Sequence, residues 1–141
     1  MVVWQQYKNN NHYQLRKAGN SLRLYRNEVF HSQYNGSRFL NGGVWDMLWL
    51  PIFFRPVDRP LRILMLGLGA GAALKKIQQY ACIDKMIAID IDATHIYIAK
   101  KFMFLTDKAI SLHRADAEQW LSSYHGPAFD IIIDDLFYEQ D

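Results

Sequence analysis

The sequence predicts an α/β fold, in which a parallel sheet flanked by helices follows a small antiparallel β element. Two observations predict the parallel part. An apolar strand runs directly into a glycine-rich loop and a helix over residues 61–80, and later apolar runs each stop at a carboxylate. The antiparallel part is indicated by alternating residues on both sides of Gly19-Asn20, a turn dipeptide.

The N-terminal element is expected to be a hairpin, His12 to Ala18 and Ser21 to Arg26, with a further strand over Val29 to Tyr34. Asn9-Asn10-Asn11 is interpreted only as a short low-complexity tract. A proline-containing linker over Arg55 to Pro60 then divides the chain. The expected domains are residues 1–60 and 61–141.

Charge is distributed unevenly between the two parts. Residues 1–62 hold nine Lys or Arg against three acids, which gives +6, and the remainder holds seven against eleven, which gives −4. Tyrosines interleaved among the N-terminal cations would suit a nucleic acid. The alternation favours a solvated hairpin instead, so nucleic acid is not an expected partner.

The glycine-rich segment is the most informative part of the sequence. A strand ending at Leu66 leads into Gly67 to Gly71, a helix is expected from near Ala72, and a second strand, Lys85 to Ile91, carries Asp90 near its end. Glycine lets the backbone approach a ligand closely, and a carboxylate about twenty residues later can bind ribose hydroxyls. This pattern predicts a nucleoside site. A dinucleotide site and simple tight helix packing remain alternatives for the glycines alone.

Carboxylates also follow the next two candidate strands. Ala109 to Arg114 precedes Asp116-Ala117, and Phe129 to Ile133 precedes Asp134-Asp135. Because the carboxyl ends of parallel strands meet at one edge, these acids should converge with the glycine loop. The convergence favours a nucleoside thioether over a dinucleotide.

From about Leu22 to Asp135 the chain resembles the spermidine synthase (aminopropyltransferase) family of the Rossmann-like class I S-adenosylmethionine-dependent methyltransferase fold. The glycine loop, the Ile-Asp-Ile-Asp run ending at Asp92 and the Asp-x-Ile-Ile-x-Asp strand ending at Asp135 carry the resemblance. It implies a catalytic carboxylate at Asp135. For the co-substrate, S-adenosylmethionine or its decarboxylated form, it implies contacts from Gly67, Leu68, Gly69, Ala70 and Gly71 at the thioether, Asp90 and Ile91 at the ribose, and Asp116 and Ala117 at the adenine.

Upstream, Val44 to Leu48 resembles the Tyr-His-Glu-Met-Leu segment that opens the family's acceptor-pocket helix. This implies that Trp45 and Asp46 bind an amine acceptor. A carboxylate pairs with an ammonium, and an aromatic face adds cation–π attraction of about 0.5 to 2 kcal/mol. The alternative is an apolar stripe of Trp45, Leu48 and Trp49, with Asp46 merely near a helix N-terminus.

Three departures affect the function expected from the resemblance. Methyltransferases commonly place an acid where this chain has Met65, which favours the aminopropyltransferases. The family usually has an acid at Ala70, facing the amine of decarboxylated S-adenosylmethionine, so the form of the co-substrate stays open. Leu136 to Glu139 replace a Ser/Thr-rich stretch with a further Asp, so the acceptor is not fixed as putrescine.

The expected chemistry requires a base at the acceptor. A carboxylate at a strand end can take the proton of an amine that attacks the carbon beside a sulfonium, and Asp135 is the residue predicted for this role. Strand alternation should send the neighbouring Asp134 to the opposite face.

Other chemistries are not expected. Cys82 is a lone cysteine, and the five histidines have no metal-ligand spacing, so no metal site is predicted. His95 is expected to be a surface or partly buried residue. No run of about eighteen apolar residues indicates a membrane span, and a cytoplasmic location is expected.

The class I fold uses seven strands, whereas this sequence ends after the fourth expected one. We therefore expect a fragment or a truncated descendant, with an unpaired sheet edge that favours a homo-oligomer. Three functions remain open: an aminopropyltransferase-like enzyme, an S-adenosylmethionine-dependent methyltransferase, and a non-catalytic nucleoside-binding or interaction remnant.

Overall fold

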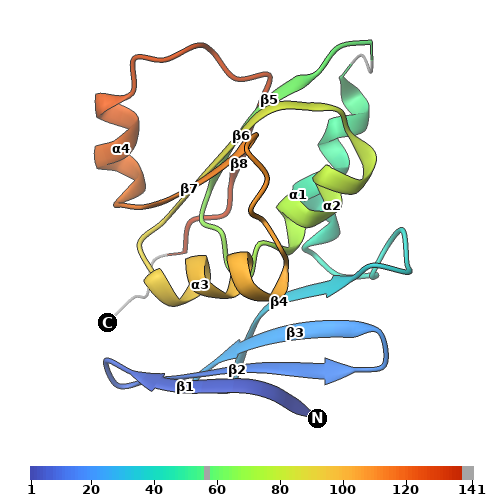
Figure 1. Cartoon of the computed structure of the whole chain (residues 1–141), viewed down its shortest axis with the longest axis vertical. Coiled ribbons are helices and arrows are strands. Elements are labelled where there is room, and N and C mark those ends of the chain that lie inside the picture. The colour runs from blue at the N-terminus through green and yellow to red at the C-terminus, as the bar shows by residue number, and fades with distance from the viewer. Residues whose placement is uncertain (56–57, 138–141) are drawn as a thin grey trace.

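The described residues form one antiparallel and one parallel sheet, each with four strands (Figure 1). The computed structural model describes residues 1–55 and 58–137. The antiparallel sheet follows the chain order, with strands β1 (Val2–Lys8), β2 (Asn11–Ala18), β3 (Ser21–Arg26) and β4 (Val29–Asn35). Ala18 pairs with Ser21, which confirms the hairpin predicted around Gly19-Asn20.

Strand β1 was not predicted from the sequence. It pairs with β2 through a turn at Asn9 and Asn10, whose φ angles are 49° and 59°. Hairpin turns that need positive φ at both central residues favour Asn, because its short polar side chain tolerates this conformation. The asparagine tract is therefore a turn.

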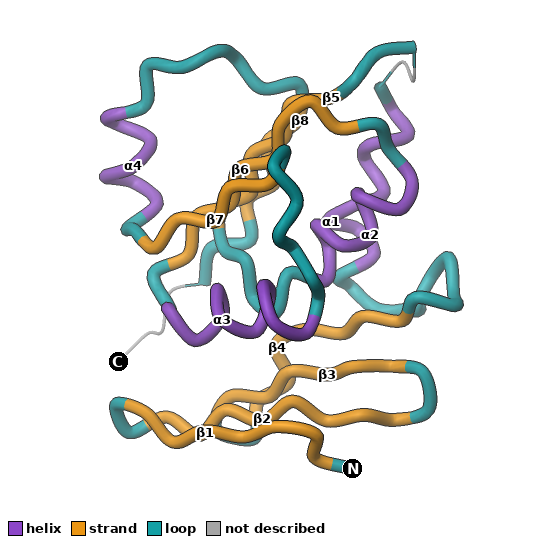
Figure 2. The backbone as a smooth tube through the Cα atoms, in the orientation of Figure 1, coloured by secondary structure: helices purple, strands orange, loops and turns teal. Residues whose placement is uncertain are grey.

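The parallel sheet has the strand order β7-β6-β5-β8. Its strands are β5 (Leu61–Leu66), β6 (Ile83–Asp90), β7 (Ile110–Arg114) and β8 (Ile131–Asp134), and the helices that connect them are α2 (Ala72–Tyr80), α3 (Ala93–Phe102) and α4 (Ala117–Ser123). A short helix α1 (Asp46–Trp49) and a 3-10 turn η1 (Leu50–Phe54) precede β5. Figure 2 shows α2 and α4 on opposite sides of the sheet. These elements confirm the predicted fold class.

The central strand β5 is buried on both faces, which explains its continuous apolar run. Ile63 and Met65 belong to the cluster that contains Leu74 of α2 and Ile98 of α3. The intervening leucines belong to a second cluster with Ala117 of α4. Alternate side chains of a strand point to opposite faces, so each face needs its own helical cover.

The antiparallel sheet packs beneath α3 (Figure 1). The Trp4 ring lies 5.6 Å from that of Tyr97 and 6.0 Å from that of Phe102, measured between centroids. Leu15 and Leu24 are fully buried and belong to the same core as β5. The two expected domains, residues 1–60 and 61–141, thus share one apolar core.

The strand order reverses next to β5. The chain passes from β5 through α2 to β6 on one side, and from β7 through α4 to β8 on the other. Crevices at such reversals, beyond the carboxyl ends of the strands, are the usual ligand sites of open α/β sheets. The fold thus places a crevice at Gly67 and Asp135.

Candidate functional site

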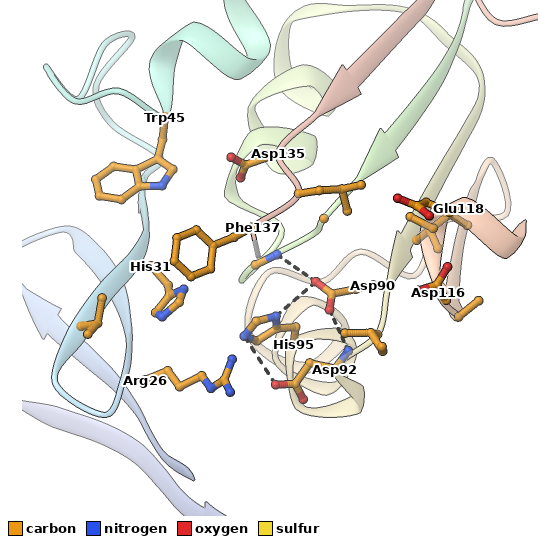
Figure 3. Close-up of a pocket in the computed structure, with 18 of the residues that line it drawn as sticks. Arg26, His31, Trp45, Asp90, Asp92, His95, Asp116, Glu118, Asp135 and Phe137 are labelled. Atoms are coloured by element: carbon orange, nitrogen blue, oxygen red, sulfur yellow. Dashed lines mark hydrogen bonds and ion pairs between the residues drawn. The ribbon is translucent and has the colours of Figure 1, made fainter. Parts of the chain in front are cut away.

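A cavity of about 530 Å³ lies at the carboxyl ends of the parallel strands (Figure 3). Cavities of this size accommodate small organic ligands. Loops after β5, β6, β7 and β8 form one side, and the β3–β4 hairpin together with Trp45 forms the other. The lining includes eight of the residues predicted for the site: Trp45, Gly67, Gly69, Asp90, Ile91, Asp116, Ala117 and Asp135.

The glycine loop presents backbone to the cavity. Gly67 has φ of +81°, and a Cβ built there would collide with the backbone carbonyl of Asp135. Two other residues of the loop, Leu68 and Ala70, are buried and do not belong to the cavity lining. Gly71, also outside the lining, begins α2 in a left-handed conformation. The loop therefore offers backbone groups rather than side chains to a ligand.

Asp90 holds this loop in place. Its Oδ2 accepts hydrogen bonds from the N–H groups of Leu68 at 2.8 Å and Gly69 at 3.2 Å. The Oδ1 atom accepts from the N–H of Asp92 at 2.8 Å. The sequence predicted a ribose contact for Asp90, and the structure adds that the same carboxylate organises the glycine loop.

His95 is buried and lines the cavity, whereas a surface or partly buried position was expected. Its Nδ1 lies 3.1 Å from Asp90 Oδ2, and its Nε2 lies 3.8 Å from Asp92 Oδ2. The sequence signal for the contact between these residues was their spacing, because His95 follows Asp92 by three residues at the start of a helix. Residues three apart share a helix face.

Asp92 receives a hydrogen bond of 2.5 Å from the Tyr13 hydroxyl. Burial alone would raise the pKa of Asp92, but the Tyr13 hydrogen bond, the charge of His95 and the bonds from Thr94 together lower it. Burial and Asp92 itself raise the pKa of Tyr13 to about 12. This contact ties β2 to the loop that follows β6.

Asp116 caps α4 while lining the cavity. Its Oδ1 accepts the N–H of Gln119 at 2.9 Å. Ala117, the next residue, is buried against the sheet, and Glu118 also lines the cavity. Asp116 Oδ2 accepts no hydrogen bond from the described residues.

Asp135 follows β8 directly, and its N–H donates to the carbonyl of Leu66 at 2.9 Å. Partial burial, then the charges of Asp134 and Asp90, raise the pKa of the Asp135 carboxyl. Asp134 lies outside the cavity lining, and its Oδ1 accepts the N–H of Leu136 at 3.1 Å. Strand alternation thus separates the two adjacent acids, and a carboxyl with a raised pKa is suited to proton transfer.

Asp46 does not reach the cavity, and the acceptor contact expected for it is not supported by its position. The side chain is buried, and its Oδ2 accepts the N–H groups of Asn41 and Gly42, each at 2.8 Å. Its Oδ1 accepts from Trp49 Nε1 at 3.3 Å. With Asn41 Nδ2, which donates to Oδ1 at 3.5 Å, the Asp46 carboxylate has four donors, all within residues 41–49. Trp45 does line the cavity, with its ring 4.4 Å from that of Phe30.

Several lining residues come from the β3–β4 hairpin of the N-terminal element, for which only a solvated role was expected. They are Arg26, Val29, Phe30 and His31. No local sequence signal could have placed them, because their position depends on how the antiparallel sheet docks. Leu136 and Phe137 also line the cavity. Tyr138 and Glu139, which replace family residues near the acceptor, lie outside the described residues.

Two further features concern metals and membranes. In residues 1–55 and 58–137, no group of three or more His, Cys, Asp or Glu side chains could hold a metal ion. No helix in this described part of the chain is long and apolar enough to cross a membrane.

The chain has a methyltransferase-like α/β fold, and its cavity lies at the carboxyl ends of the strands, where open α/β sheets usually bind ligands. The family model described as the spermine/spermidine synthase domain matches residues 46–140, and the chain belongs to this family. It is 28% identical over 112 residues to polyamine aminopropyltransferase 2 of Caldanaerobacter subterraneus, a match that covers 71% of this chain and 38% of the relative. The chain therefore spans well under half the length of this relative.

Solved structures show the same fold. Spermidine synthase from Thermotoga maritima superposes with a TM-score of 0.73 at 18% identity, covering 99% of this chain and 48% of that one. A spermidine synthase in complex with the transition-state analogue AdoDATO superposes with a TM-score of 0.72 at 18% identity, covering 95% of this chain and 47% of that one. The family predicted from the glycine loop and strand-end acids is confirmed.

Proposed function

We propose that this chain binds decarboxylated S-adenosylmethionine and transfers its aminopropyl group to an amine acceptor. The observation that carries the proposal is the meeting of the glycine loop, Asp90, Asp116 and Asp135 around one cavity, in a member of this family. Similarity of fold to a spermidine synthase bound to a transition-state analogue supports the same placement of a nucleoside here.

The donor's parts are assigned to different strand ends. In the proposal, Asp116 and Ala117 contact the adenine, Asp90 with Ile91 contacts the ribose, and the loop from Gly67 passes under the sulfonium. Because glycine residues have no side chain, the positively charged sulfur can approach the backbone of this loop closely. The reacting carbon then lies near Asp135.

The transfer step is a displacement at carbon. The acceptor nitrogen forms a bond to the aminopropyl carbon while the bond between that carbon and sulfur breaks. The electron pair of the broken bond stays with sulfur. The product thioether, methylthioadenosine, is neutral, and the excess proton of the new ammonium passes to Asp135. Because the pKa of Asp135 is raised, its carboxylate is a stronger proton acceptor than an ordinary aspartate.

The proposed acceptor end is mainly aromatic among the described residues. Trp45 and Phe137 line the cavity near Asp135 (Figure 3), and Phe30, also in the lining, packs its ring 4.4 Å from that of Trp45. An alkylamine could place its methylenes on these rings and its ammonium over one face, worth about 0.5 to 2 kcal/mol per cation–π contact. Asp46 has no part in this proposal because it lies outside the lining.

A specific observation favours a second candidate, an S-adenosylmethionine-dependent methyltransferase. Ala70 is buried and apolar where the family usually has an acid that faces the amine of the decarboxylated donor. Without that carboxylate, this chain lacks one interaction that would favour decarboxylated S-adenosylmethionine over S-adenosylmethionine. Binding without any transfer would instead support the non-catalytic alternative.

The proposal includes a homo-oligomer. Within the described residues β8 pairs with β5 alone, and Ile132 on β8 is 59% exposed. Unpaired strand edges with exposed apolar side chains favour pairing with another chain. Sedimentation velocity tests this part, and a monomer at all concentrations would contradict it.

Calorimetry and single-turnover assays test the function. Calorimetry compares decarboxylated S-adenosylmethionine, S-adenosylmethionine and methylthioadenosine, and tighter binding of S-adenosylmethionine would favour the methyltransferase. Transfer from the decarboxylated donor is then measured with a panel of mono- and diamines. Asp135→Asn should lower the rate by roughly 10² to 10⁴ with donor affinity retained. Asp134→Asn is the matched control, and equal losses in both would contradict the assignment of the base.

A further inference from the structure

A series of polar contacts links the N-terminal sheet to the glycine loop. The Tyr13 hydroxyl of β2 donates to Asp92 Oδ2 at 2.5 Å, and the same oxygen lies 3.8 Å from His95 Nε2. His95 Nδ1 lies 3.1 Å from Asp90 Oδ2, as the dashed lines of Figure 3 trace. Tyr13, Asp90 and His95 are all less than a tenth exposed. The series therefore runs through the interior.

The geometry fixes which atom donates. A carboxylate at Asp90 can only accept, so the 3.1 Å contact places a proton on His95 Nδ1. His95 Nε2 is buried and has no hydrogen-bond partner in the described part of the chain. The contact to Asp90 is thus the one hydrogen bond that His95 makes through its ring there.

Counting acceptor sites shows what Asp90 can still offer. A carboxylate has about four lone-pair sites, two on each oxygen. Oδ2 is shared among the N–H groups of Leu68 and Gly69 and His95 Nδ1, so this oxygen is filled. Within the described residues Oδ1 accepts only the Asp92 N–H, which leaves about one acceptor site on an aspartate that lines the cavity. Asp90 can therefore accept one ribose hydroxyl, through Oδ1.

His95 contributes to the orientation of the Asp90 carboxylate. Backbone N–H groups bind both oxygens, those of Leu68 and Gly69 at Oδ2 and that of Asp92 at Oδ1, and His95 Nδ1 is a further donor at Oδ2. His95 is the one side chain among the described residues with a hydrogen bond to Asp90. On its other side, His95 Nε2 lies 3.8 Å from the Asp92 carboxylate, which Tyr13 holds from the neighbouring sheet.

We infer that His95 is a positioning residue that turns Asp90 so that Oδ1 selects a single ribose hydroxyl, and that Tyr13 acts on the same selection through Asp92. The inference rests on the proposed nucleoside site but not on aminopropyl transfer. It makes discrimination between ribose and deoxyribose depend on a residue of the antiparallel sheet, about eighty positions away in sequence from Asp92.

Binding of methylthioadenosine and its 2′-deoxy and 3′-deoxy analogues tests the selection. The wild type should prefer the ribonucleoside over one of the two deoxy analogues by about tenfold or more. His95→Leu should weaken ribonucleoside binding by a similar factor and abolish this preference. His95→Asn is the matched variant, because its amide can donate near the position of Nδ1, and it should stay within about threefold of wild type. Tyr13→Phe should give an intermediate loss of preference.

A purely structural role predicts a different result. His95→Leu would then lower the melting temperature while leaving the ratio of the two affinities unchanged, and this outcome would overturn the inference. Hydrogen exchange provides a readout that needs no ligand. The amides of Leu68 and Gly69 should exchange about tenfold faster in His95→Leu and at the wild-type rate in His95→Asn. Unchanged protection in His95→Leu would also overturn the inference.

The experiments separate this inference from the proposed function. A wild type that binds and discriminates nucleosides but transfers no aminopropyl group would contradict the function and leave the inference supported. Transfer activity together with unchanged ribose selection in His95→Leu would contradict the inference alone.

Discussion

Gly67 lies against the backbone carbonyl of Asp135, so closely that any side chain at Gly67 would collide with it. The Asp135 N–H also donates to Leu66 at 2.9 Å. Backbone contacts between the ends of β5 and β8 therefore hold the glycine loop and the proposed base together. A shift of the glycine loop would therefore displace Asp135, and a shift of Asp135 would displace the loop.

The first prediction compares two glycines of the loop. Gly67→Ala should destabilise the fold by about 2 to 4 kcal/mol, because it combines a positive φ with a collision against backbone. Gly69→Ala is the control. It also has positive φ, but its Cβ would meet Ser32 at 3.7 Å and the His31 carbonyl oxygen at 3.9 Å, both ordinary contact distances, so about 1 kcal/mol is expected. Urea denaturation measures both, and equal losses would contradict the backbone contact.

A second prediction concerns the titration of Asp135. The charge of Asp134 helps to raise the pKa of Asp135, so Asp134→Asn should lower that pKa. Carbon-13 NMR of the Asp135 carboxyl measures it directly. Glu118→Gln, which removes another cavity acid that does not contribute to this shift, serves as the control. An Asp135 pKa that moves equally in both variants would contradict the local origin of the shift.

The same raised pKa has a consequence for stability. The native state binds the Asp135 proton more tightly than the unfolded chain does, so this group stabilises the fold below the ordinary aspartate pKa. That contribution is lost as pH rises through the raised native pKa. Asp135→Asn should therefore flatten the fall in stability over this window, measured by urea denaturation from pH 3 upward. A steeper fall in the variant than in the wild type would contradict the direction of the shift.

Alkaline denaturation provides a third test, at Tyr13. Its folded pKa is about 12, above the ordinary value of 10.0, so its contribution is fully present below pH 10 and is lost as pH rises through 12. Tyr13→Phe should cost about 1 to 3 kcal/mol at pH 8, since Asp92 loses its buried donor. The difference between wild type and variant should narrow between pH 10 and 12. A constant difference would show that the hydroxyl does not bind Asp92 in solution.

Lys76 is the subject of a fourth prediction. Its ammonium is buried, donates to the Arg38 carbonyl, and lies 5.7 to 5.9 Å from the ring centroids of Tyr34, Trp49 and Tyr80. Lys76→Ala should destabilise the fold by about 2 to 4 kcal/mol through lost packing and cation–π contacts. Lys100→Ala, at an exposed position of α3, should change stability by less than about 0.5 kcal/mol. Thermal unfolding compares them, and similar small losses would remove the structural role of Lys76.

The parallel half of the fold could be predicted because its signals are local. The apolar run of β5, the glycines after it and the acids after β6, β7 and β8 each lie within a few residues of the element that they define. Parallel strands necessarily bring their carboxyl ends to one edge, so Asp90, Asp116 and Asp135 had to converge once the strands were recognised. Strand β1 was not predicted. The turn that joins it to β2, at Asn9 and Asn10, resembled a polar low-complexity tract in the sequence.

The sequence by itself therefore determined the α/β class, the family and the strand-end acids, because periodicity and spacing are properties of neighbouring residues. Only the tertiary structure decided which side chains face the cavity. It directed Asp46 into its own loop, buried His95 against Asp90, and placed the β3–β4 hairpin on the cavity wall. These positions depend on packing between segments far apart in the chain, and the free energy of such contacts leaves no pattern in either segment alone.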